Sequence, residues 1–111
     1  MLFMIHSQYT EDKRYAMTIR EQMGNVSSEV WRALRAKASN NISRMNTAVD
    51  AVLELLVATR SDPKNQSKRR EIARSREIFL DYITDTNEYN ETAERIDKYF
   101  TEYALVARAM K

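Results

Sequence analysis

The chain has 111 residues, which is enough for one small domain, and 43% of them are hydrophobic while 31% are charged. This balance is typical of a soluble, helix-rich protein and not of a disordered one. A single glycine and a single proline are too few for the many turns of an all-β fold. The absence of cysteine excludes disulfides and thiolate metal sites. The formal net charge of +2 indicates no strong preference for a basic or an acidic partner.

The first segment, residues 1–24, is predicted to contain a short helix over about 11–23. Thr10 is a suitable N-cap, and Gly24 suits the position that follows a helix C-terminus. The apolar start at residues 1–5 has no basic region before it and is too short for a signal peptide or a membrane span. We therefore expect a cytoplasmic protein without a membrane-spanning segment.

The remaining residues, 27–111, are predicted to form a long antiparallel helical hairpin. Its first helix runs over about 28–59, and its second runs over about 63–110. Asp62 is a suitable N-cap for the second helix, and Pro63 suits the first helical position, where its missing N–H costs nothing. No further glycine or proline interrupts these stretches, and a second helix of this length would measure about 70 Å, which is typical of coiled-coil packing.

A heptad pattern supports this hairpin. Apolar side chains recur at the a and d positions of both helices, with Trp31 at the first a position of the first helix. The phase in the second helix continues across residues 84–87, so we expect no break there. In the register that best matches small residues with large ones, two polar residues of the seam, Asn41 and Thr86, face each other and set the register. The expected architecture is all-α, in a single domain 1–111, completed as a three-helix bundle or as a helical oligomer.

In this register the last helix extends beyond its partner. The helix over 11–23 is too short to cover hairpin arms of about 30 residues each, so part of the apolar surface stays uncovered. We therefore expect a protein partner or a second copy of the chain, with a homo-oligomer as the expected state. Large aromatic side chains are frequent interface residues, and the candidate partner-binding residues are Tyr99, Phe100, Tyr103, Val106 and Met110.

A basic block at the predicted hairpin tip is the second candidate site, and it comprises Lys64, Lys68, Arg69, Arg70, Arg74 and Arg76. Cations at the N-terminal end of a helix oppose its dipole, so the block is a candidate for binding the phosphates of nucleic acid or anionic lipid. The alternative is that it faces Asp50 and Glu54 across the hairpin. No aromatic residue lies within the block for base stacking. Nucleic-acid binding is therefore our second hypothesis for the function.

No group of residues predicts catalysis. His6 is the single histidine, and without cysteine it cannot form a zinc site of the usual ligands. The carboxylates of Glu88, Glu91 and Glu94 fall on the outward side of the predicted seam, where no pocket would shift their pKa values. We expect no enzyme, no cofactor and no small-molecule substrate. The prediction is a helical protein-interaction module, acting as an adaptor, inhibitor, chaperone or assembly subunit.

Overall fold

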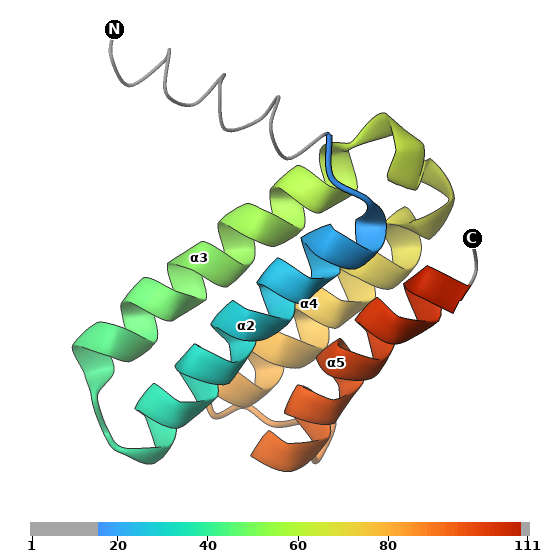
Figure 1. Cartoon of the computed structure of the whole chain (residues 1–111). Coiled ribbons are helices and arrows are strands. Elements are labelled where there is room, and N and C mark those ends of the chain that lie inside the picture. Colours follow the sequence, from blue (N-terminus) through green and yellow to red (C-terminus); the bar gives the residue numbers. More distant parts are fainter. Residues whose placement is uncertain (1–15, 110–111) are drawn as a thin grey trace, which may run out of the picture.

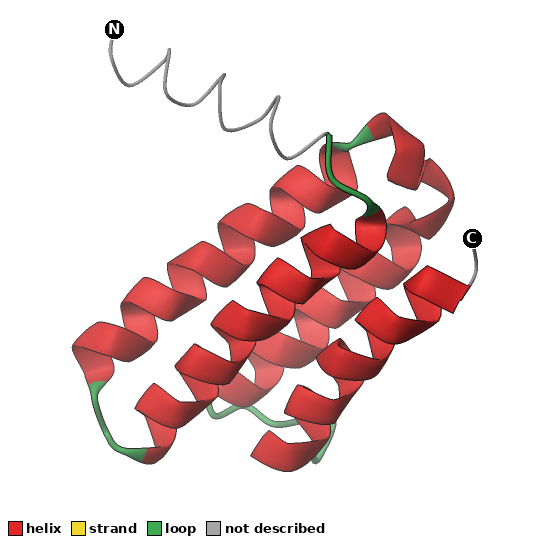
Figure 2. Cartoon of the chain, viewed as in Figure 1, coloured by secondary structure: helices red, strands yellow, loops and turns green. Residues whose placement is uncertain are grey.

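A computed structural model describes residues 16–109, with side chains described through Tyr103. The described residues hold four α-helices and no strand. They are α2 (Ile19–Ala38), α3 (Ile42–Ser61), α4 (Arg69–Ile83) and α5 (Ala93–Ala109), with the short 3-10 helix η1 (Pro63–Lys68) between α3 and α4. The expected all-α class is confirmed. The prediction of a hairpin of two long helices is wrong, because a loop divides each of the predicted helices into two (Figure 2).

Each of the described helices runs antiparallel to the one before it, so the chain reverses direction along the bundle from one helix to the next (Figure 1). Helix α2 lies between α3 and α5 and has its most extensive contacts with these two helices. Helix α4 lies behind α2 and completes the bundle (Figure 1). The molecule measures 37 × 35 × 18 Å. A four-helix bundle therefore replaces the expected three-helix bundle.

Helix α2 begins earlier than predicted and contains Gly24. Thr18 caps it in a reciprocal capping box, in which the Thr18 hydroxyl accepts from the Glu21 N–H at 3.2 Å and the Thr18 N–H donates to the Glu21 carboxylate at 2.9 Å. This cap satisfies two backbone donors at once, and the helix continues through Gly24 to Ala38. The predicted helix end at Gly24 is wrong. The start of the predicted helix over 11–23 lies outside the described residues.

Gly24 offers a direct test of this helix. It has no left-handed φ, and no described atom lies within 4 Å of a Cβ placed on it. We expect Gly24→Ala to raise the free energy of unfolding by about 0.5–1 kcal/mol, because alanine restricts the unfolded chain more than glycine does. Urea denaturation measures this change. A loss of stability would instead indicate a glycine that terminates the helix in the left-handed conformation.

The break between α2 and α3 is made by two consecutive asparagines. Asn40 has a φ of 58°, which asparagine tolerates better than most residues. The Asn41 side chain then accepts from the Arg44 N–H at 3.1 Å and caps α3. Asn41 is exposed. The prediction that Asn41 pairs with Thr86 and sets the register is therefore wrong, because the Asn41 side chain caps the start of α3 instead.

The break between α4 and α5 is a polar loop over residues 84–92. Its backbone has positive φ at Asp85, Asn87 and Asn90. The Asp81 carboxylate accepts from the N–H groups of Glu88 and Tyr89 at 2.8 and 3.1 Å and holds the loop to the end of α4. Thr86 lies in this loop and is exposed. The expected continuous heptad seam across 84–87 is therefore wrong.

The corner between α3 and α4 follows the prediction in part. The Asp62 side chain accepts from the Lys64 N–H at 3.1 Å, and Pro63 occupies the first turn of the new element. This element is η1, and α4 begins after it at Arg69. The role of Asp62 as a cap is confirmed, although the helix that it caps is the short 3-10 helix.

The core lies where the four helices meet. Fully buried side chains come from every helix, and the largest of them are Met23, Val26 and Val30 of α2, Val52 and Leu56 of α3, Ile72 and Phe79 of α4, and Ile96 and Phe100 of α5. Burying such a side chain contributes about 1.5–3 kcal/mol to folding. Phe100, which the predicted hairpin leaves uncovered, is therefore buried within one chain.

Candidate functional site

The predicted partner-binding residues of α5 lie partly in the core. Phe100 is fully buried, and its ring meets that of Phe79 edge to face with 6.3 Å between the centroids. Tyr99 and Tyr103 are half-buried. The side chain of Val106 and all of Met110 lie outside the part of the chain whose side chains are described. In this fold Phe100 is therefore not accessible to a partner.

The two tyrosines of α5 are held against α4. The Tyr99 hydroxyl donates to the Glu71 carboxylate at 3.0 Å. Burial raises the pKa of Tyr103 to about 12, and the charge of Glu71 adds to this effect. Burial and the Glu71 carboxylate raise the pKa of Tyr99 further. Both phenols stay protonated at neutral pH, so they serve as hydrogen-bond donors and not as bases.

A buried polar cluster joins α2 to the corner between α3 and α4. Gln22 Nε2 donates to Asp62 Oδ2 at 2.9 Å, and Asn65 Nδ2 donates to Gln22 Oε1 at 2.8 Å and to the Thr59 carbonyl at 2.9 Å. Lys64 pairs with Asp62 as well. Every buried polar side-chain atom of the described residues has a partner. A saturated cluster of this kind has no free group to offer a ligand, so its role is structural.

The pKa of Asp62 reflects the balance within this cluster. Burial alone would raise it, but the hydrogen bonds from Lys64 and Gln22 outweigh burial and hold the pKa of Asp62 below its ordinary value of 3.8. The carboxylate is therefore ionised at neutral pH, and its charge is compensated on several sides.

The predicted basic block is divided by the structure. Lys64 pairs with Asp62, and Arg69 Nε donates to the Arg60 carbonyl at 3.0 Å. Lys68 is partly exposed. The three other arginines of the block are Arg70, Arg74 and Arg76. They are exposed and form no ion pair within the described residues. Within the part of the chain that the structure describes, no ion pair joins the block to Asp50 or Glu54.

Trp31, the only tryptophan of the chain, is exposed on the outer side of α2. Its side chain is 47% exposed, although most aromatic rings of the bundle are buried or half-buried. The guanidinium of Arg35, one helical turn later, lies over the indole ring at 4.7 Å from its centroid. Such a cation–π contact holds both side chains in one orientation on the surface. The heptad pattern placed Trp31 in a seam, so sequence reasoning missed its exposure.

Two hollows meet at Trp31. One, of about 960 Å³, lies between α2 and α3, and the other, of about 330 Å³, lies between α2 and α5. Trp31 and Arg32 line both. We call the larger hollow and its rim the Trp31 surface, and its defining residues are Trp31, Arg32, Arg35, Arg44, Ala48 and Ala51.

The floor and rim of the Trp31 surface differ in chemistry. Small side chains of α3, including Ala48 and Ala51, form part of its lining. Arg32 pairs with Glu29 of the same helix, whereas Arg35 and Arg44 form no ion pair within the described residues. The surface therefore offers an exposed aromatic ring, a shallow floor and unneutralised positive charge.

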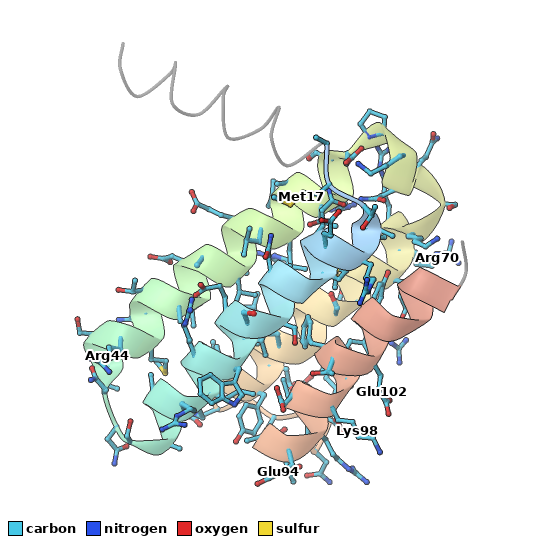
Figure 3. All side chains as sticks on the ribbon, viewed as in Figure 1. Met17, Arg44, Arg70, Glu94, Lys98 and Glu102 are labelled. Atoms are coloured by element: carbon cyan, nitrogen blue, oxygen red, sulfur yellow. The ribbon has the colours of Figure 1, made fainter. Side chains whose placement is uncertain are left out.

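Figure 3 separates the two basic regions. Arg44 lies at the start of α3, and Arg70 lies near the start of α4, at the opposite end of the bundle (Figure 3). The Trp31 surface and the basic block are therefore two different candidate sites. The outward side of α5, with Glu94, Lys98 and Glu102 labelled, is of mixed charge (Figure 3).

Other kinds of site do not occur in the described part of the chain. No group of three or more potential ligands stands close enough to hold a metal ion. None of the helices described is long and apolar enough to cross a membrane. The predicted exposure of Glu88 and Glu94 is confirmed, whereas Glu91 is partly buried. The backbone N–H and carbonyl of Glu91 are bonded to the Asn87 side chain, and its carboxylate pairs with Arg95. His6 lies outside the described residues.

Comparison with known proteins returned no match to a protein-family model, a curated protein or a solved structure.

Proposed function

We propose that this chain is a non-enzymatic, helical protein-binding module, and that its binding site is the Trp31 surface. The observation that carries the proposal is the exposure of Trp31 beside Arg35. Tryptophan and arginine are the residues most enriched among those that dominate binding energy at protein interfaces. A half-exposed tryptophan held by a cation–π contact is already oriented for binding, so little side-chain entropy is lost when a partner arrives.

The charge of the Trp31 surface indicates the kind of partner. Arg35 and Arg44 line it and form no ion pair within the described residues, while Glu29, the acidic residue of the lining, pairs with Arg32. Negative groups on a partner would be complementary to them and would raise the association rate. The hollow lies between two helices, and an amphipathic helix can place its apolar side into a groove of this kind. The proposed partner is therefore a protein that presents an acidic amphipathic helix.

Binding of a labelled acidic amphipathic peptide tests this proposal. We expect the emission of Trp31 to shift to shorter wavelength on binding, because the indole ring leaves water. Trp31→Ala should weaken binding at least about tenfold, as measured by fluorescence anisotropy of the peptide label. Tyr89→Ala is the matched control, because Tyr89 is 48% exposed and lies in the loop before α5.

Two outcomes would contradict the protein-binding proposal. One is equal affinity of the peptide for the unchanged chain and for Trp31→Ala. The other is equal affinity of the chain for an acidic peptide and for a basic peptide with the same apolar pattern, because Arg35 and Arg44 would then have no part in recognition.

Nucleic-acid binding stays the second candidate function, and one observation favours it. Arg70, Arg74 and Arg76 are exposed without an ion pair among the described residues. Against it, Glu71 and Glu77 lie exposed on the same helix, which reduces the positive charge available to phosphates. Affinity for a labelled oligonucleotide that falls steeply between low and moderate salt and is lost in Arg70→Glu/Arg74→Glu would support this candidate.

A further inference from the structure

A second surface of the same chain has the chemistry that the Trp31 surface would recognise. On α3, Asp50, Leu53, Glu54 and Val57 follow one another at helical spacings i, i+3, i+4 and i+7, which places them on one side of the helix. We call these four residues the α3 stripe. Val57 is 60% exposed, Leu53 is partly exposed, and both carboxylates are exposed. The α3 stripe is therefore a short acidic amphipathic face on a helix that is already folded.

The charges of the two surfaces are complementary, and on each surface two charged side chains form no ion pair. Asp50 and Glu54 form no ion pair within the described residues, and the same holds for Arg35 and Arg44 of the Trp31 surface. Two anions on one face thus match two cations on the other. Opposite potentials on two exposed surfaces favour their association.

The two surfaces cannot meet within one chain. The residues that α3 contributes to the Trp31 surface include Arg44, Ala48 and Ala51, and these lie on a different side of the helix from Asp50 and Val57. The contact must therefore form between two copies, with the α3 stripe of one copy against the Trp31 surface of another.

We infer that the partner of the Trp31 surface is a second copy of this chain, which docks through its α3 stripe. This inference rests on the proposed function, because it uses the same surface and names its occupant. Val57 and Leu53 meet the indole ring of Trp31, and the two carboxylates meet Arg35 and Arg44. Since the contact joins two different surfaces, a copy that uses one of them can still offer the other.

Charge reversal with complementation tests the contact. One variant carries Arg35→Glu and Arg44→Glu, and the other carries Asp50→Lys and Glu54→Lys. In each variant alone, both surfaces have the same sign, and we expect self-association to weaken at least about tenfold. When the two variants are mixed, the reversed Trp31 surface of one matches the reversed stripe of the other, and association should return.

Light scattering over a concentration series measures this association. The unchanged chain should rise above the 13.0 kDa of a single copy as concentration increases, and the mixture should behave like it. All four substitutions are at exposed positions, and circular dichroism checks that both variants are folded. The control is a variant that carries both Arg70→Glu and Arg74→Glu. We expect its mass in solution to equal that of the unchanged chain at each concentration.

The outcomes separate this inference from the proposed function. A chain that stays at the mass of one copy at every concentration overturns self-docking, while the peptide experiment still decides whether the Trp31 surface binds an acidic helix. Association that survives in both variants, or that does not return on mixing, also overturns the inference, because the contact then lies elsewhere.

Discussion

Phe100→Ala is expected to lower the free energy of unfolding by about 3–5 kcal/mol. The side chain is fully buried, and its ring lies edge to face with the rings of Phe79 and Tyr99, at 6.3 and 5.4 Å between centroids. Alanine would leave a cavity at the contact between α4 and α5 and remove both aromatic contacts. A small domain has a total stability of about 5–15 kcal/mol. The variant should therefore unfold at a clearly lower urea concentration than the unchanged chain.

The matched control is Tyr89→Ala, which removes an exposed aromatic side chain and should change stability by no more than about 0.5 kcal/mol. The comparison also decides between two roles of the C-terminal helix. If Phe100→Ala kept its full stability and lost self-association instead, Phe100 would belong to an interface between copies and not to the core of one chain.

Asp62→Ala is expected to have the second largest effect, a loss of about 2–4 kcal/mol. Two contributions act together. The substitution removes the cap of η1, and it removes the hydrogen bond that the buried Gln22 side chain donates to Asp62. Asp50→Ala is the control, since Asp50 is an exposed aspartate that forms no ion pair within the described residues.

The lowered pKa of Asp62 determines how the difference in stability between the unchanged chain and Asp62→Ala depends on pH. In the folded chain the pKa lies below 3.8, so folding favours the ionised carboxylate. Its stabilising contribution is complete above the unfolded value near 3.8 and is lost as the pH falls through the lower folded value. Urea denaturation of the unchanged chain and of Asp62→Ala from pH 7 downward should show that their difference in stability shrinks only near and below pH 3.8. A difference that shrinks between pH 7 and pH 5 would contradict this assignment.

The all-α class and the Asp62–Pro63 corner could be predicted from sequence because they depend on local chemistry. A chain with one glycine and one proline has few ways to turn, and a helix cap followed by proline is a strong local signal. The helix end at Gly24 was wrong because a capping box at Thr18 and Glu21 begins α2 just before it. Glycine at a helix interior costs only about 1 kcal/mol, which tertiary contacts easily offset.

The two missed breaks have a common cause. Asn40, Asp85, Asn87 and Asn90 take a positive φ, which glycine adopts most readily. The prediction considered only glycine and proline as residues that interrupt a helix. A heptad phase that continues across such a loop does not require a continuous helix, because the helices on either side bury their apolar faces in the same core. Once the long helices are broken, the residues around Phe100 fold back onto their own chain, and the expected overhang disappears.

The candidate site was missed for a related reason. The heptad phase assigned Trp31 to the seam, and nothing local distinguishes a buried tryptophan from an exposed one. Its exposure depends on the positions of α3 and α5, which were set by the breaks. The pairing of Trp31 with an arginine four residues later was the one available signal, since such a pair forms a cation–π contact only where both side chains share one helix face.

The position of α2 between α3 and α5 also governs the order in which the fold can assemble. The Ser27 and Thr101 hydroxyls lie 3.4 Å apart across α2 and α5 although they are 74 residues apart in sequence. During synthesis, α2 and α3 can pair as soon as both have left the ribosome. The face of α2 that contacts α5 stays uncovered until α3, α4 and α5 have all been synthesised. Until then its apolar side chains stay open to other molecules. Nascent chains that stop before α5 should therefore aggregate more readily than the complete protein.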